Sequence, residues 1–166
     1  MRYIFIFMVF VLTGCATCKY STKDTSPIPP EIKTFRVTYF ENRASYVNSQ
    51  LAPQLTEKLK QKIISQTRLR QVNNDDAHYD ISGTVTEYFV STSGIAGQNA
   101  TTNRLNVGFH LIFKNKLDQK KDFETDLTRN YDFNAQLSLT QAEGRLLDEL
   151  IKNMVDEIFN KIFSNW

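Results

Sequence analysis

The sequence has 166 residues, 41% of them hydrophobic and 12% aromatic, so the chain is expected to fold around an apolar core rather than stay disordered. The 20 Lys and Arg residues against 18 Asp and Glu give a formal charge of +2, which lacks the basic footprint of a nucleic-acid-binding protein. Two histidines and two cysteines leave little from which to build a metal site.

The N-terminal residues have the pattern of a lipoprotein signal. Arg2 supplies a positive charge, and the apolar run at 3–12 is far shorter than the roughly 20 residues of a membrane-spanning helix. Leu12-Thr13-Gly14-Cys15 follows, with Leu three places before Cys and small residues between. We predict that 1–14 is removed and that Cys15 carries acyl and diacylglycerol chains, which anchor the mature protein in a membrane. The alternative, an ordinary signal peptide with a chance cysteine, is disfavoured by this spacing.

Residues 15–31 are predicted to form a flexible tether. Ser, Thr, Lys and Asp dominate it, and Pro27-Ile28-Pro29-Pro30 stiffens its end toward an extended spacer. With Cys15 acylated, Cys18 is an odd thiol, which an oxidising compartment could cap or pair between chains. A tether residue without function is the preferred interpretation of Cys18. The folded domain is expected over 32–166.

For the first half of this domain, the sequence pattern predicts a strand, a helix and a second, short strand. Ile32–Phe40 alternates as a strand does, 41–49 reads as a loop, and Leu69–Val72 is a short strand. A helix is expected over Gln50–Gln66, because apolar residues recur every four positions. The predicted buried stripe of this helix consists of Leu51, Leu55, Leu59 and Ile63.

For the second half of the domain, the sequence pattern predicts three long strands and a final helix. Strands are expected at Tyr79–Val90, with Tyr79, Ile81, Val85 and Phe89 on one face, at Leu105–Phe113 and at Phe123–Tyr131. The segment 91–103, rich in Ser, Thr and Gly, is expected to be a loop with a mobile tip. A helix is predicted over Thr140–Phe163, capped by Ser138 or Thr140.

The element order β-α-β-β-β-β-α indicates an α+β fold with one parallel crossover followed by an antiparallel meander. Each helix must bury one face, so we expect a two-layer α/β sandwich, with a mixed, twisted sheet of four to five strands and two helices on one face. The other sheet face, or its edges, stays available to a partner.

Catalytic motifs are absent from the sequence. It holds no Gly-rich phosphate loop, no His-Glu-x-x-His and no Gly-x-Ser-x-Gly. Cys15 and Cys18 have the spacing of a redox pair, but Cys15 is committed to lipid. His78 and His110 are interpreted as surface residues, and the carboxylates are placed on solvated faces. We therefore expect no enzyme activity and no cofactor beyond the covalent anchor.

Four segments resemble the Bacteroidota branch of the LptE family, the lipopolysaccharide-assembly lipoproteins. They are 35–44, 109–124, Tyr131-Asp-Phe and Ile158–Trp166. The resemblance implies a lipoprotein in the inner leaflet of the outer membrane, facing the periplasm. It would sit as a plug in the LptD β-barrel, help that barrel assemble and help deliver lipopolysaccharide. A polar sheet face and the 91–103 segment suit a water-filled barrel lumen.

The phosphates of lipopolysaccharide would need basic partners. The candidates for phosphate or barrel contact are Lys58, Lys62, Arg68, Arg70 and Arg104. A solvated helix face is the preferred alternative for this basic stretch. At the level of the whole protein, two other functions stay open: a generic envelope lipoprotein that binds a small periplasmic ligand or scaffolds another complex, and an unrecognised envelope hydrolase.

Overall fold

The computed structural model describes residues 28–96 and 99–164. The predicted signal peptide 1–14, the anchor Cys15, Cys18 and most of the tether lie outside the described residues. Ile28, assigned to the tether from the sequence, is buried with 7% exposure, and its carbonyl accepts a hydrogen bond from the Arg68 guanidinium. The packed part of the chain therefore extends to the N-terminal side of the predicted boundary at 32.

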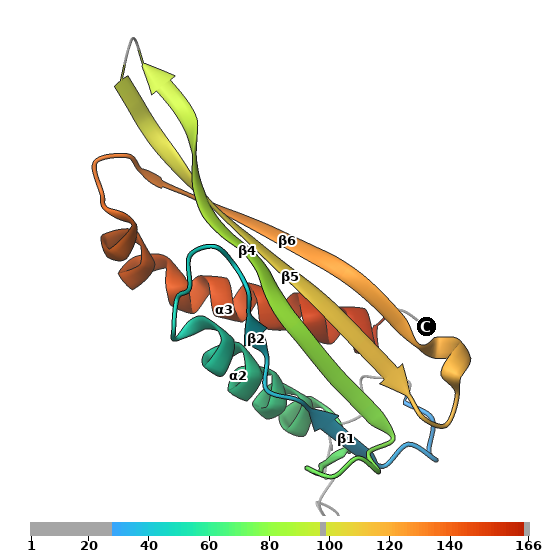
Figure 1. The fold of residues 1–166 in the computed structure, drawn as a ribbon. Coiled ribbons are helices and arrows are strands. Elements are labelled where there is room, and N and C mark those ends of the chain that lie inside the picture. Colours follow the sequence, from blue (N-terminus) through green and yellow to red (C-terminus); the bar gives the residue numbers. More distant parts are fainter. Residues whose placement is uncertain (1–27, 97–98, 165–166) are drawn as a thin grey trace, which may run out of the picture.

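One mixed sheet and two helices make up the described part of the chain, as a two-layer α+β sandwich (Figure 1). The six strands run in the order β3-β1-β4-β5-β6, and β2 pairs with β4. Both helices, α2 (Leu51–Gln66) and α3 (Leu139–Phe163), cover the same face of the sheet. The strands are β1 (Thr34–Val37), β2 (Glu41–Asn42), β3 (Arg70–Gln71), β4 (Tyr79–Ala96), β5 (Asn99–Asn115) and β6 (Phe123–Asn134).

The predicted topology is confirmed. β1 pairs in parallel with β3 and with β4, so α2 is the crossover between parallel strands, while β4, β5 and β6 form the antiparallel meander. The strand count exceeds the expected four to five because β2 lies in the predicted 41–49 loop. This strand pairs Glu41 and Asn42 in parallel with Thr84 and Val85, a contact too short to leave an alternation in the sequence.

Both helices form for the reasons that the sequence suggested. The predicted stripe of α2 is fully buried, and α3 begins with a capping box. In that box Gln141 N donates to Ser138 Oγ at 3.3 Å and Ser138 N donates to Gln141 Oε1 at 3.0 Å, which satisfies amides at the start of the helix. Neither described helix combines the length and apolar character that crossing a membrane requires.

Aromatic side chains fill the space between the two layers. The Phe40 ring meets the edge of Phe109 at a centroid distance of 4.9 Å, and Tyr79 meets Phe113 at 5.0 Å. Such edge-to-face pairs contribute about 0.5–1.5 kcal/mol beyond the area they bury. Because the apolar faces of β4 and β5 pack here against the helices, the opposite face of the sheet is left open.

The predicted loop at 91–103 is wrong, because most of this segment is strand. β4 continues to Ala96 and β5 starts at Asn99, with Ser91 opposite Arg104 and Thr92 opposite Asn103. The two strands project beyond the helices as a narrow arm (Figure 1). An arm that buries neither face needs no apolar alternation, so its Ser/Thr-rich sequence resembled that of a loop.

The predicted face of Phe89 is also wrong. The pairing of β4 with β5 shifts between Val85 and Glu87, and a bulge of this kind moves the side chains that follow it, up to the next shift after Thr92, to the opposite face. Tyr88 is consequently 1% exposed and packs toward the helices, whereas Phe89 is 46% exposed.

Candidate interaction surface

The open face of the sheet carries ionic pairs between facing residues of adjacent strands. Arg36 of β1 binds Asp80 of β4 through two bonds, Nε to Oδ1 at 2.9 Å and Nη2 to Oδ2 at 2.7 Å. On the next strands, His110 Nδ1 lies 2.7 Å from Asp126 Oδ1. In each case the two residues are direct register partners, so strand pairing itself places the hydrogen-bonding side chains next to each other.

A third pair lies where the arm leaves the sheet. Arg104 of β5 donates to Asp132 of β6, Nε to Oδ1 at 2.7 Å and Nη2 to Oδ2 at 3.0 Å. This guanidinium keeps the pKa of Asp132 below its usual range. Paired charges leave the face polar without a strong field of one sign, which suits a polar, hydrated partner surface better than a polyanion.

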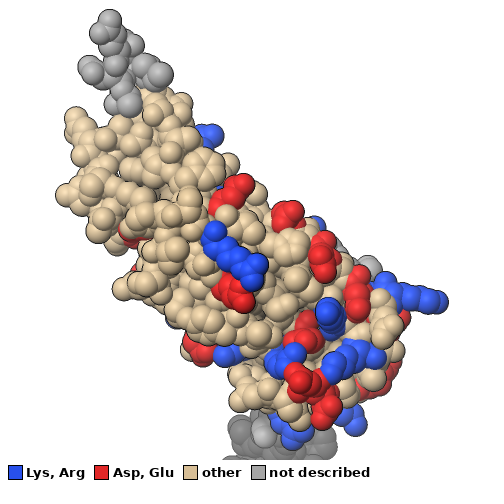
Figure 2. Space-filling model, viewed as in Figure 1, with Lys and Arg blue, Asp and Glu red and all other residues tan. Residues whose placement is uncertain are grey.

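Charged side chains are unevenly distributed along the molecule. In Figure 2, Lys and Arg mix with Asp and Glu over the broad end, while the end that carries the arm is almost free of charge. The sequence explains this, because 88–103 contains no charged residue. The molecule therefore offers two surfaces of different chemistry, a charged but balanced sheet face and an uncharged arm.

A buried carboxylate at the base of the arm was missed from the sequence. Glu143 of α3 is 8% exposed and accepts hydrogen bonds from Tyr88 Oη at 2.8 Å and Asn48 Nδ2 at 2.9 Å. Tyr46 stacks on Tyr88 with ring centroids 5.6 Å apart, and its hydroxyl lies 3.4 Å from Glu143 Oε2. Burial, and then Glu143, raise the pKa of Tyr88 above its ordinary value.

The expectation that the carboxylates lie on solvated faces is thus wrong for Glu143. A signal was present, because Glu143 precedes Leu147 and Leu150 at helical spacing and so belongs to the apolar stripe of α3. The cluster joins β4, α3 and the segment before α2. Its donors satisfy the carboxylate, so the cluster connects the root of the arm to the helix layer.

The two predicted basic residues on α2 have different surroundings. Lys58 is exposed, whereas Lys62 donates to Asp156 Oδ1 at 2.7 Å and lies 5.1 Å from the centroid of the Phe159 ring. Lys62 therefore fastens α2 to α3, and a phosphate would have to compete with an ion pair and a cation–π contact for it.

The three predicted arginines are dispersed. Arg68 binds the carbonyl of Ile28, Arg70 is exposed on β3, and Arg104 is paired with Asp132 on the open sheet face. The helix layer and the open face are opposite sides of the molecule, so the five candidates do not converge on one site. Their contact with phosphate or barrel stays a prediction.

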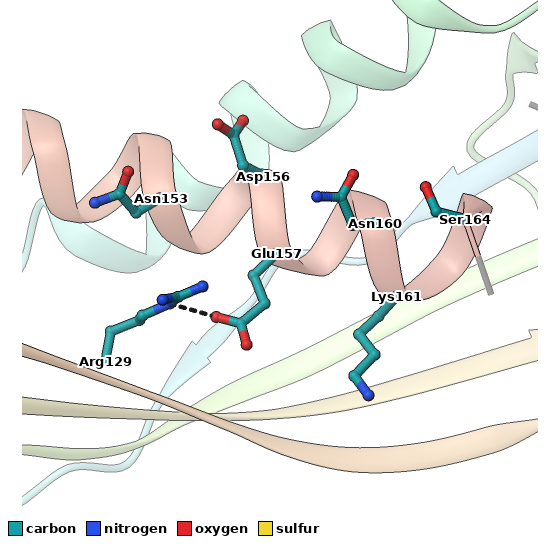
Figure 3. Close-up of a pocket in the computed structure, with 7 residues that line it drawn as sticks. All are labelled: Arg129, Asn153, Asp156, Glu157, Asn160, Lys161 and Ser164. Atoms are coloured by element: carbon teal, nitrogen blue, oxygen red, sulfur yellow. Dashed lines mark hydrogen bonds and ion pairs between the residues drawn. The ribbon is translucent and has the colours of Figure 1, made fainter. Parts of the chain in front are cut away.

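An open pocket of about 440 Å³ with polar lining residues lies along α3, beside Arg129 of β6 (Figure 3). Arg129 enters it from β6 and donates from Nε to Glu157 Oε2 at 2.6 Å, and Lys161 of α3 extends toward the sheet. Asp156 lies on the same helix but belongs to the ion pair with Lys62. The pocket thus holds charges of both signs. Within residues 28–96 and 99–164, no group of His, Cys, Asp or Glu is arranged to hold a metal ion.

Comparison with known families gives a match over most of the domain. The family model described as LptE, lipopolysaccharide-assembly, matches residues 32–162. Among the curated proteins, none matches the chain.

Solved structures share the fold at low sequence identity. A minor lipoprotein from Acinetobacter baumannii superposes with a TM-score of 0.51 and 16% identity, covering 80% of this chain and 93% of that one. Lipoprotein B from Nitrosomonas europaea gives a TM-score of 0.52 and 17% identity, covering 80% and 83%. The rare lipoprotein B from Shewanella oneidensis gives 0.50 and 12%, covering 76% and 92%. At these identities the likeness establishes the two-layer fold and nothing finer.

Proposed function

Because the chain belongs to the LptE family of lipopolysaccharide-assembly proteins, we propose that it is an outer-membrane lipoprotein that plugs an LptD-like β-barrel. In this proposal it helps the barrel assemble and assists insertion of lipopolysaccharide into the outer membrane. The family is one of assembly factors rather than enzymes, and the protein acts by shape and contact. The Bacteroidota branch stays a prediction.

The observation that carries the proposal, beside the family itself, is the open sheet face. Its cross-strand pairs, such as Arg36 with Asp80 and Arg104 with Asp132, keep it polar with little net charge. The inner wall of a wide membrane β-barrel is polar and hydrated. A plug that presents paired charges to such a wall can exchange water for protein contacts without burying an isolated charge.

The predicted anchor fits the geometry of such a plug. Lipidation of Cys15 would hold the chain in the periplasm-facing leaflet, and 16–27 separates the lipid from Ile28, which packs in the core of the domain. Fully extended, a segment of this length spans at most roughly 40 Å. That reach allows the domain to enter a barrel lumen from the periplasmic side while the lipid stays in the leaflet.

Contact with lipopolysaccharide is proposed for the basic residues that face solvent. Lys58 and Arg70 are exposed, and within the described residues neither forms an ion pair, so both can bind a phosphate without losing an internal partner. Lys62 and Arg104 could contribute only by exchanging a carboxylate partner that they already hold, whereas Arg68 donates to the Ile28 carbonyl and keeps further N–H groups for a phosphate.

The decisive experiment is a mild-detergent pull-down of the lipidated, C-terminally tagged protein from isolated outer membranes, with mass spectrometry of what is recovered. A large outer-membrane barrel in near-equal amount is the expected result. A clean monomer from intact outer membranes would contradict the plug and favour a lipoprotein that binds a small periplasmic ligand. Fractionation of the protein with the inner membrane would contradict the proposed location.

A further inference from the structure

Exposed apolar side chains gather at the base of the arm. Tyr46, Val47, Phe89 and Val90 are 42%, 58%, 46% and 37% exposed, which is unusual for large apolar residues so close together. A groove of about 420 Å³, which Tyr46, Phe89 and Val90 help to line, lies between β4, β6 and the segments that precede α2 and α3. All of its lining residues are uncharged, and Phe133 of β6 is one of them.

The edge of β4 beside this groove has no strand partner within the described residues. β2 pairs only with Thr84 and Val85 of β4. The hydrogen bonding along this edge ends where Arg43 N, just after β2, donates to Val85 O at 2.9 Å. Farther along, β4 pairs only with β5. Between the register shifts at Val85/Glu87 and Thr92/Gly94, residues 88–92 form a regular stretch. Alternate backbone N–H and C=O groups of this stretch therefore face away from β5, toward a side where no strand of the described residues pairs with them.

Charged side chains protect the opposite edge strand, β6, from pairing with other chains, whereas the β4 edge at 88–92 has no such protection. β6 carries Glu124, Asp126, Arg129 and Asp132 along its length, and charges of this kind keep edge strands from pairing with other chains. The β4 stretch at 88–92 holds no charged residue and no proline. An unprotected edge next to an apolar groove combines the two elements of strand addition, backbone bonds for affinity and side-chain pockets for specificity.

We propose that an uncharged, extended segment of the β-barrel partner pairs with 88–92 of β4 as an additional strand, along the part of this edge with which β2 does not pair. Its alternate apolar side chains fill the groove beside Tyr46 and Phe133. This inference rests on the proposed function and identifies a surface through which the protein contacts the barrel. An acyl chain could occupy the groove, but it would form no hydrogen bonds with the backbone of the β4 edge, whereas an added strand fills the groove and also bonds to that edge.

Hydrogen exchange tests the strand directly. We would compare the lipidated full chain alone with the same chain in its purified barrel complex. The expected result is that amides within 88–92 exchange at least about tenfold more slowly in the complex. A complex that forms while these amides exchange as they do in the free chain would overturn the inference and leave the proposed plug intact. Failure to recover any barrel would count against the plug itself.

A matched pair of variants separates the groove beside β4 from the rest of the surface. Val90→Lys places a charge in the groove, and Gln119→Lys places one at an exposed position in the β5–β6 turn, outside both the groove and the open sheet face. With both variants folded to the wild-type melting temperature, Val90→Lys should recover at least about fivefold less barrel than Gln119→Lys. Equal recovery would contradict the inference.

The occupant is identified by a photo-crosslinking amino acid at position 90 in intact cells. A crosslink to one short, uncharged peptide of the barrel is expected. An adduct with lipid, or with a second copy of this chain, would overturn the inference in favour of that occupant.

Discussion

Tyr88 of β4 donates its phenolic hydrogen to Glu143 of α3 across 2.8 Å, in a site where both side chains are buried. This bond ties the root of the arm to the helix layer, and Asn48 adds a second donor from the segment before α2. Three parts of the chain that are distant in sequence thus share one carboxylate. That shared acceptor therefore links β4, at the root of the arm, to α3 and to the segment before α2.

We expect Glu143→Ala to lower the free energy of unfolding by about 2–3 kcal/mol, because it leaves the buried Tyr88 hydroxyl and the half-buried Asn48 amide without this acceptor. Urea denaturation of the chain measures this. The matched control is Glu149→Ala, which removes an exposed carboxylate from the same helix and should cost less than about 0.5 kcal/mol. Equal losses for the two variants would show that the cluster does not support the fold.

Tyr79 should make the protein less stable at alkaline pH. Burial, and then the charge of Glu31, raise the pKa of Tyr79 from 10.0 to about 12. The unfolded chain therefore loses this proton first. The contribution is fully present below pH 10 and declines as pH rises toward 12, by about 2 kcal/mol or less.

The variant Tyr79→Phe tests this pH dependence. Within the described residues the Tyr79 hydroxyl is buried without a hydrogen-bond partner, so its removal should be neutral or stabilise by up to about 1 kcal/mol at pH 7. It should also flatten the decline above pH 10. Tyr39→Phe, at a 63% exposed position, is the control and should leave the profile unchanged. A steep decline that persists in Tyr79→Phe would assign it to other groups.

Two glycines should respond to alanine in opposite ways. A Cβ on Gly83 would lie 2.7 Å from Cε1 of Phe109 and 2.8 Å from the carbonyl oxygen of His110, so Gly83→Ala should cost about 1–3 kcal/mol or more. Gly144 lies in α3 with nothing within 4 Å of an added Cβ. Gly144→Ala should stabilise by about 0.5–1 kcal/mol, since alanine favours the helix. Thermal unfolding of both variants checks the sign of each change.

Charge reversal at the exposed basic residues tests their proposed contact with lipopolysaccharide. Lys58→Glu combined with Arg70→Glu should weaken binding of purified lipopolysaccharide by about tenfold, because each change replaces an attraction for phosphate with a repulsion. Lys62 is left intact, since reversing it would also break its bond to Asp156. Lys120→Glu, an exposed charge in the β5–β6 turn, is the control. Binding that equals that of this control would remove the phosphate hypothesis.

The sequence by itself determined the elements whose signals are local. A four-residue apolar repeat defined α2, the Ser138–Gln141 capping box marked the start of α3, and alternation marked the regular part of β5. Their order was enough for the two-layer architecture, because an amphipathic helix must cover a sheet and a parallel connection needs a crossover.

Only the tertiary structure decided what depends on pairing between distant residues. The bulge after Val85 moved Phe89 to the exposed face, and the arm formed because β4 and β5 satisfy each other's backbone without burying a face. Glu143 accepts a hydrogen bond from Tyr88, which lies 55 positions away in the sequence. Lys62 forms an ion pair with Asp156, which lies 94 positions away. Strand register and ion pairing depend on which segments meet in space, and a periodicity along one segment carries no information about that meeting.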